Sequence, residues 1–151
     1  AEFNKLVSRS VWDGNTVKLV ELPTGGRAFA RPNSYEIHLA PTNEQWIVVH
    51  ELGHVLEKQA GALPRALAYF DQRTAGDQWE KMSVITGQKT YRDDEVAKKD
   101  KWLEPYMGKD YNRYYTEIIS MGVQFMYEKP AEFAREDPGM FEFIYNLLRG
   151  R

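Results

Sequence analysis

Apolar and polar residues alternate through the first third of the chain, and this alternation predicts strands. It covers three segments, TVKLVE (16–21), GRAFAR (26–31) and YEIHLA (35–40). A Thr-Gly-Gly turn and a Pro-Asn pair separate the segments, and β-branched residues are frequent in the first. We therefore predict a small, mostly antiparallel sheet in a strand-rich region that spans residues 1–41.

From residue 42 the apolar period changes to about 3.6, which predicts a helix. Thr42 and Gln45 have the spacing of a capping box, and a glycine follows the last expected helical residue. We expect the helix to cover 43–59, within the segment 42–61. The apolar face that would pack on the sheet consists of Ile47, Val48, Leu52, Val55 and Leu56.

The rest of the chain is predicted to be mainly helical, with one charged interruption. Pro64 suits the first turn of a second helix. The segment 87–115 joins a charged loop, GQKTYRDDEVAKKDK, to an aromatic turn or hairpin, WLEPYMGKDY. Region 116–150 predicts helices, with Thr116 as a cap and Pro130 as a break. The expected fold class is α+β, with an N-terminal sheet and a helical C-terminal half.

Composition and charge narrow the class of protein. The 151 residues suffice for a single domain, 1–151, and 42% of them are hydrophobic and 28% charged, as in soluble globular proteins. A net charge of −2 argues against nucleic acid and anionic membranes as partners. There is no cysteine, so a metal would need histidine and carboxylate ligands. The N-terminus AEFNKLVSRS has no signal-peptide core, and its abrupt start suits a domain excised from a longer chain.

Two of the three histidines lie four residues apart in VVHELGHVLE, residues 48–57. On a helix this spacing puts His50 and His54 one turn apart, so both rings can face one divalent ion. Zinc suits imidazole and carboxylate ligands, and a catalytic zinc keeps an open position for water. Glu51 would project beside the ion, where it can accept a proton. An ordinary pair of surface or core histidines is the alternative, and the glutamate inside the motif favours the metal site.

Two histidines are too few ligands, so we expect a third further along the chain. Six residues after the second histidine stands Ala60, which excludes the motif with three histidines. Glu117, in YYTEIISMG, is the predicted third ligand, and its alternative role is to complement a helix N-terminus. Glu57 competes because it continues the histidine stripe. It lies one turn beyond His54, however, and we expect it to hydrogen-bond a ring nitrogen instead.

These motifs resemble those of the zincin metallopeptidases, in which HExxH lies in a helix after an edge strand. A glutamate ligand on a separate helix makes the chain gluzincin-like. The runs VVHELGHVLE, PYMGKDY and TEIISMGVQFMYE resemble, more narrowly, the zincin-like domain of phage head-morphogenesis (minor head) proteins, over roughly residues 35–149. The resemblance implies a zincin-like fold in which the N-terminal sheet packs on the active-site helix. It also implies Zn²⁺ held by His50, His54 and Glu117, with Glu51 as the general base.

One position departs from the gluzincin pattern. Many gluzincins carry an aspartate four residues after the glutamate ligand, where it orients a histidine, but this chain has Met121 there. Ser120, on nearly the same helix face, is a candidate to orient a histidine in its place.

The implied reaction is hydrolysis of a peptide or protein substrate, with Glu51 moving the proton. Candidates for a donor to the oxyanion precede the glutamate ligand and are Tyr111, Tyr114 and Arg113. His38, in the strand before the active-site helix, is a candidate for the substrate groove, where a peptide could add as a strand. A solvent-facing position is the simpler expectation for His38.

Three functions fit the predicted site. The first is an active zinc metallopeptidase associated with a phage or prophage, which the intact Glu51 favours. The second is a zinc-binding structural or interaction module of a phage head with little or no turnover, for which the Met121 departure leaves room. The third is a peptidase toxin domain. The resemblance implies other domains of a larger phage protein as partners, and a location in the cytoplasm of the bacterial host or in the virion.

Overall fold

A computed structural model describes residues 3–12, 14–59 and 61–151, and the account that follows concerns these residues. Ala60, where the sequence excludes a third histidine ligand, lies outside them. The helices and strands, in chain order, are α1 (Phe3–Leu6), η1 (Arg9–Trp12), β1 (Lys18–Glu21), β2 (Phe29–Arg31), η2 (Pro32–Ser34), β3 (Glu36–Leu39), α2 (Gln45–Leu56), α3 (Ala62–Arg73), β4 (Trp79–Lys81), α4 (Met82–Thr86), β5 (Val96–Lys98), η3 (Pro105–Gly108), α5 (Ile118–Glu128), α6 (Pro130–Glu136) and α7 (Pro138–Leu148). The predicted α+β class, with an N-terminal sheet and a helical C-terminal half, is confirmed.

The N-terminal sheet contains the three predicted strands, but its pairing is mixed rather than mostly antiparallel. β3 lies in the centre, parallel to β1 and antiparallel to β2. β3 is well buried, with Ile37 at 0% exposure, whereas β1 is mostly exposed. The strand before the HELGH helix is therefore central, and not the edge strand that the resemblance implied. The edge strand that contacts α2 is β2.

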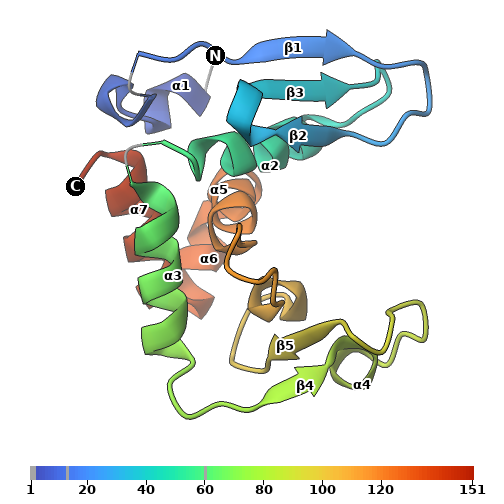
Figure 1. Cartoon of the computed structure of the whole chain (residues 1–151). Helices are drawn as coiled ribbons and strands as arrows, with labels where there is room; N and C mark the ends of the chain where they lie inside the picture. The colour runs from blue at the N-terminus through green and yellow to red at the C-terminus, as the bar shows by residue number, and fades with distance from the viewer. Residues whose placement is uncertain (1–2, 13, 60) are drawn as a thin grey trace.

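Helix α2 lies between this sheet and α5 (Figure 1). It begins at Gln45 with Glu44 as the N-cap residue and no side-chain cap, so the predicted capping box with Thr42 is wrong. Asn43 instead accepts a hydrogen bond of 2.6 Å from the Ala40 N–H, which closes the turn between β3 and α2. The buried positions of α2, which is covered from two sides, are Val49, Gly53, Val55 and Leu56. The predicted apolar face is therefore only partly correct, because Ile47, Val48 and Leu52 are half-buried.

Helix α5 forms the middle of the helical half, with α3, α6 and α7 packed against it. Phe133 of α6 and Ile144 of α7 are fully buried there. α5 has Glu117 as its N-cap residue and no side-chain cap, so the prediction that Thr116 caps it is wrong by one residue. The Thr116 hydroxyl still accepts a hydrogen bond from the Ile118 N–H, at 3.2 Å. α6 begins at Pro130, where the break was expected. None of the helices in the described ranges has the length and apolarity to span a bilayer.

The charged segment 87–101 differs from the predicted loop, because it contains strand β5. β5 pairs antiparallel with β4, and its middle residue, Ala97, is fully buried. A three-residue strand inside a highly charged run is too short to show a period, so the alternation was hidden. An isolated β-bridge between Ala97 and Lys109 joins this pair of strands to the turn that follows η3. β4 and β5 therefore form a second, two-stranded sheet, which lies far from the N-terminal sheet in Figure 1.

Candidate metal centre

The two HELGH histidines stand one turn apart on α2, as their spacing predicts. Their ring centroids are 5.0 Å apart and the rings meet edge to face, at 81°. Both are partly buried, with side-chain exposures of 20% for His50 and 14% for His54. Burial, and after it the neighbouring imidazole, lower the pKa of His54, although the Glu117 carboxylate opposes this. The lowered pKa favours the neutral imidazole, which is the form that binds a metal.

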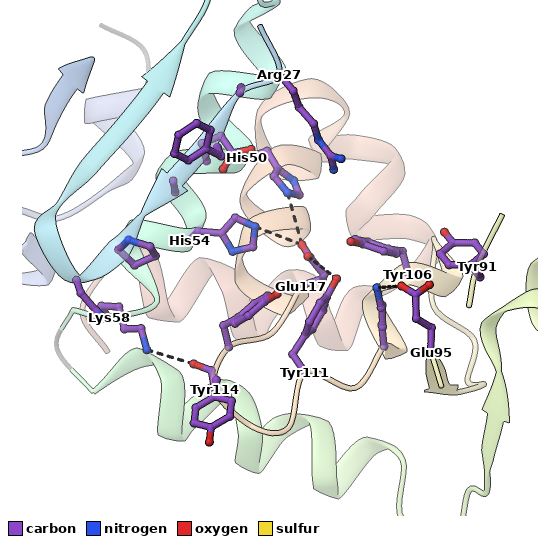
Figure 2. Close-up of a pocket in the computed structure, with 18 of the residues that line it drawn as sticks. Arg27, His50, His54, Lys58, Tyr91, Glu95, Tyr106, Tyr111, Tyr114 and Glu117 are labelled. Carbon is purple, nitrogen blue, oxygen red and sulfur yellow. Dashed lines mark hydrogen bonds and ion pairs between the residues drawn. The ribbon is translucent and has the colours of Figure 1, made fainter. Parts of the chain in front are cut away.

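Glu117 joins the two histidines from the start of α5. Its Oε2 atom lies 3.5 Å from Nε2 of His50 and 3.5 Å from Nε2 of His54, and the residue is only 4% exposed. One ligand atom from each of the three residues lies within 4.8 Å of the other two. In Figure 2, dashed lines join the Glu117 carboxylate to both rings. The structure thus brings together the three residues that the sequence predicts as ligands.

Each of two predicted ligands is held by a neighbour on α5. His50 Nδ1 lies 3.0 Å from Oε1 of Gln124, so this nitrogen donates and Nε2 keeps its lone pair for a metal. The Gln124 amide in turn donates to Glu128 at 2.8 Å. Ser120 Oγ donates to Oε2 of Glu117 at 2.7 Å. The expectation that Ser120 orients a histidine is therefore wrong, since it holds the carboxylate instead.

Sequence analysis missed Gln124, although a signal for it exists. Glu117, Ser120, Gln124 and Glu128 follow one another at spacings of three, four and four, and so form a polar stripe on an otherwise apolar helix. Met121, at the position where gluzincins have an aspartate, is buried in the hydrophobic core. The residue that orients a histidine thus lies one turn further along α5 than that pattern places it.

Glu57 does not contact a histidine, which corrects the expected hydrogen bond to a ring nitrogen. Its carboxylate accepts from the Thr116 N–H, at 3.0 and 3.1 Å from its two oxygens, and from the Thr116 hydroxyl at 2.5 Å. The residue is 1% exposed, and burial raises its pKa to about 7, although the hydrogen bonds from Thr116 oppose the shift. Glu57 therefore ties the end of α2 to the residue immediately before Glu117.

Glu51 lies beside the ligand group and lines the pocket in front of it. Burial raises the pKa of its carboxyl; the His50 charge opposes this shift, and the Glu117 charge adds to it. The backbone N–H of Ala30 in β2 also opposes the shift, since it lowers the pKa of Glu51 and so favours the ionised form. The edge strand β2 therefore contributes to the electrostatic environment of Glu51.

The three candidates for an oxyanion donor occupy different positions. The Tyr111 hydroxyl donates to Glu117 Oε1 at 3.0 Å, and burial raises its pKa, so it reaches the site but is engaged with the carboxylate. Tyr114 is 74% exposed, and Figure 2 shows its ring directed away from Glu117. Arg113 makes a bidentate ion pair with Asp71 of α3, at 3.0 and 2.9 Å. Of the three, only Tyr111 brings its polar end to the ligand group.

His38 is neither in the pocket nor facing solvent, so both expectations for it are wrong. It is 7% exposed and stacks on Phe29, with ring centroids 4.3 Å apart, and its Nε2 lies 3.3 Å from Glu36. The alternation in β3 was identified correctly, but β1 and β2 cover this strand from both edges and a neighbouring ring covers the imidazole.

An open pocket of about 1190 Å³ lies in front of the ligand group. On one side it is bounded by residues 27–30 around the start of β2, and on the other by the segment before β5 and the turn after η3. Many of the residues that line it are aromatic, namely Phe29, Tyr91, Tyr106, Tyr111, Tyr114 and Tyr115. Tyr115 stacks on Tyr111 at 4.2 Å and meets His54 edge to face at 6.0 Å. The site is thus accessible to a molecule much larger than water.

The donor set fits a zinc ion. Two imidazoles and one carboxylate are the ligand types that zinc accepts in catalytic sites, and they leave a position open toward the pocket. The atoms of His50 and Glu117 that face away from the shared centre are already hydrogen-bonded, as in metal sites whose ligands are oriented by their surroundings.

Comparisons with protein-family models, with curated proteins and with solved structures found no match to this chain.

Proposed function

We propose that this protein is a zincin-like zinc metallopeptidase in which His50, His54 and Glu117 hold the metal and Glu51 is the general base. One observation carries the proposal. The three predicted ligands, distant in sequence, offer ligand atoms within 4.8 Å of one another at the wall of a large pocket, and Glu51 lines the same pocket. A structural zinc site has no need of a pocket or of a base, and it normally closes its fourth position.

A bound zinc ion would supply Lewis acidity, lowering the pKa of a water molecule and polarising the scissile carbonyl. The residues of the chain supply the proton transfer. Glu51 accepts a proton and later delivers it to the leaving amine, and burial shifts its pKa upward, toward the range in which a base can also act as an acid near neutral pH. The Ala30 N–H favours the ionised form of this carboxylate, which is the form that accepts a proton.

The shape of the pocket supports a peptide as the substrate class. Among the described residues, β2 is paired with β3 alone, so its other edge is free, and residues 28–30 line the pocket. An extended peptide can pair with a free strand edge and so pass in front of the ligand group. The resemblance to phage head-morphogenesis domains supports a protein substrate in a virion or its host.

The test combines metal analysis with hydrolysis of an unbiased peptide library. We expect Glu51→Gln to bind one equivalent of zinc and to lose at least about 100-fold in kcat/KM, because general-base catalysis contributes about that factor or more. His50→Ala should lose the zinc, whereas His38→Gln, at the one histidine outside the ligand group, should keep it. Hydrolysis by Glu51→Gln at the wild-type rate would exclude the base. Stoichiometric zinc with no hydrolysis in the wild type would favour the structural module.

A further inference from the structure

Two positively charged side chains bracket the histidines along the pocket. Lys58 follows His54 at the spacing at which His54 follows His50, so it continues the same stripe just beyond the end of α2. Arg27 precedes β2 and lines the pocket on the His50 side. Figure 2 shows the four side chains in the order Arg27, His50, His54 and Lys58, with Arg27 extending over the pocket.

Neither of these two side chains forms a salt bridge with a described carboxylate of the pocket, although the charge of Arg27 lowers the pKa of Glu51. The third cation of the lining, Lys109, lies 2.6 Å from Glu95 and is thereby neutralised. The remaining carboxylates of the lining, Glu51 and Glu117, belong to the ligand group and its base.

In the part of the chain that the structure describes, neither Arg27 nor Lys58 makes an ion pair. Lys58 donates only to a neutral group, the Tyr114 carbonyl, at 3.1 Å. Both side chains are exposed, so a ligand can reach them. The chain as a whole carries a net charge of −2. Arg27 and Lys58 therefore create local positive charge on either side of the two histidines, in a protein whose net charge is negative.

Resting on the proposed function, we propose that the substrate is a peptide with an acidic side chain on each side of the scissile bond. An extended peptide that crosses the histidine pair places its flanking residues near the two cations. The Arg27 guanidinium can bind a carboxylate with two parallel hydrogen bonds, and the Lys58 ammonium can bind one as a point charge. A free C-terminal carboxylate offers the same chemistry at one end, so the test must separate it from an acidic side chain.

Binding tests the inference independently of turnover. Dye-labelled peptides of one length, blocked at both ends, carry Glu, Gln or Lys on the two sides of a central apolar pair, and a further Gln peptide has a free C-terminus. Their affinities for zinc-loaded Glu51→Gln are measured by fluorescence anisotropy at low salt. We expect the Glu peptide to bind about five- to tenfold more tightly than the Gln peptide, since two exposed ion pairs contribute about that much. Near 1 M salt the difference should vanish, because the Debye length there is about 3 Å.

Substitutions of Arg27 and Lys58 test whether these two cations cause the preference for the Glu peptide. Arg27→Gln and Lys58→Gln should each remove part of the preference, and the double substitution all of it. Lys18→Gln, an exposed cation of β1 outside the pocket, should leave the preference unchanged. Equal binding of Glu and Gln peptides at low salt, or a preference that survives the double substitution, would overturn the inference. Tighter binding of the Gln peptide with a free C-terminus than of the blocked Glu peptide would also overturn it, in favour of a C-terminal carboxylate.

The same peptides distinguish this inference from the proposed function. If wild-type protein binds the Glu peptide preferentially but hydrolyses no peptide, the preference for carboxylates stands and the peptidase proposal fails. If it hydrolyses Glu and Gln peptides at equal rates and binds them equally, the peptidase proposal stands and the acidic preference fails.

Discussion

Helices α2 and α5 approach each other closely at Gly53. A Cβ at this position would lie 2.5 Å from Cα of Ser120, 3.1 Å from the Ser120 nitrogen and 3.3 Å from the Ile119 carbonyl oxygen. All three are backbone atoms of α5, which cannot rotate away as a side chain can. Gly53→Ala therefore has to move α2 and α5 apart.

The size of the effect follows from these distances. Carbon atoms in contact prefer about 3.5–4.0 Å, so the helices must separate locally by about 1 Å. Overpacking of this kind costs about 1–3 kcal/mol, and the better helix propensity of alanine offsets about 1 kcal/mol, so the net loss in free energy of unfolding is about 0–2 kcal/mol. Functional groups need to be held within about 0.5 Å, however, and Glu117 approaches both histidines from the displaced helix. We expect zinc affinity to fall by at least about tenfold.

Zinc affinity is measured by competition with a chromophoric chelator, and the free energy of unfolding by urea titration in the presence of a chelator. Gly122→Ala is the matched control on α5. Its Cβ would meet Ile144 Cγ1 at 2.5 Å and Cδ1 at 2.6 Å, which are side-chain atoms of α7. This variant should lose stability by a similar amount and keep wild-type zinc affinity. Wild-type zinc affinity in Gly53→Ala would refute the idea that this contact sets the position of Glu117.

Three further predictions concern the neighbours of the ligands. Gln124→Leu should weaken zinc binding about 10- to 100-fold by freeing the His50 ring; unchanged affinity in the chelator competition would show that the amide does not orient the imidazole. Tyr111→Phe removes a hydrogen bond to the Glu117 carboxylate and should lower zinc affinity by a factor corresponding to about 1.5–3 kcal/mol, measured in the same way; a loss of hydrolysis with full zinc affinity would instead make the hydroxyl catalytic. The folded-state pKa of Glu57, about 7, lies above its ordinary value of 4.5, so the folded state binds this proton more tightly than the unfolded state does. The proton's contribution to stability is therefore full below pH 4.5 and is lost as pH rises through 7. Glu57→Gln should reduce the difference in free energy of unfolding between pH 5 and pH 8, by up to about 3 kcal/mol, and an identical pH dependence in the two proteins would contradict the shift.

The sequence was most informative where a function depends on neighbouring positions of one helix. The spacing of His50 and His54 fixes their relation, because an α-helix repeats every 3.6 residues or so. The strands of the first region were likewise found from their alternation. Their pairing was not, since alternation defines the faces of a strand and carries no information about its partners.

Glu117 was predicted as a ligand although it lies far from the HELGH helix in the sequence. Its candidacy came from the ligand count that zinc requires and from the resemblance to gluzincins, and the structure places it 3.5 Å from both histidine Nε2 atoms. The roles of Ser120 and Glu57 could not be predicted in the same way. Both lie at helical spacings that allow several partners, and the partner was decided by how closely α5 approaches α2 at Gly53.

By itself, the sequence determined the α+β class and the HELGH stripe, because each depends on local periodicity, and it made Glu117 the candidate third ligand through the ligand count of zinc and the resemblance to gluzincins. Only the tertiary structure decided that β2 forms the edge beside the site, that Gln124 holds His50, and that Arg27 and Lys58 lie on either side of the two histidines in the pocket lining. These relations join residues far apart in the chain. They depend on how the sheet and helices pack against each other, which no local pattern encodes.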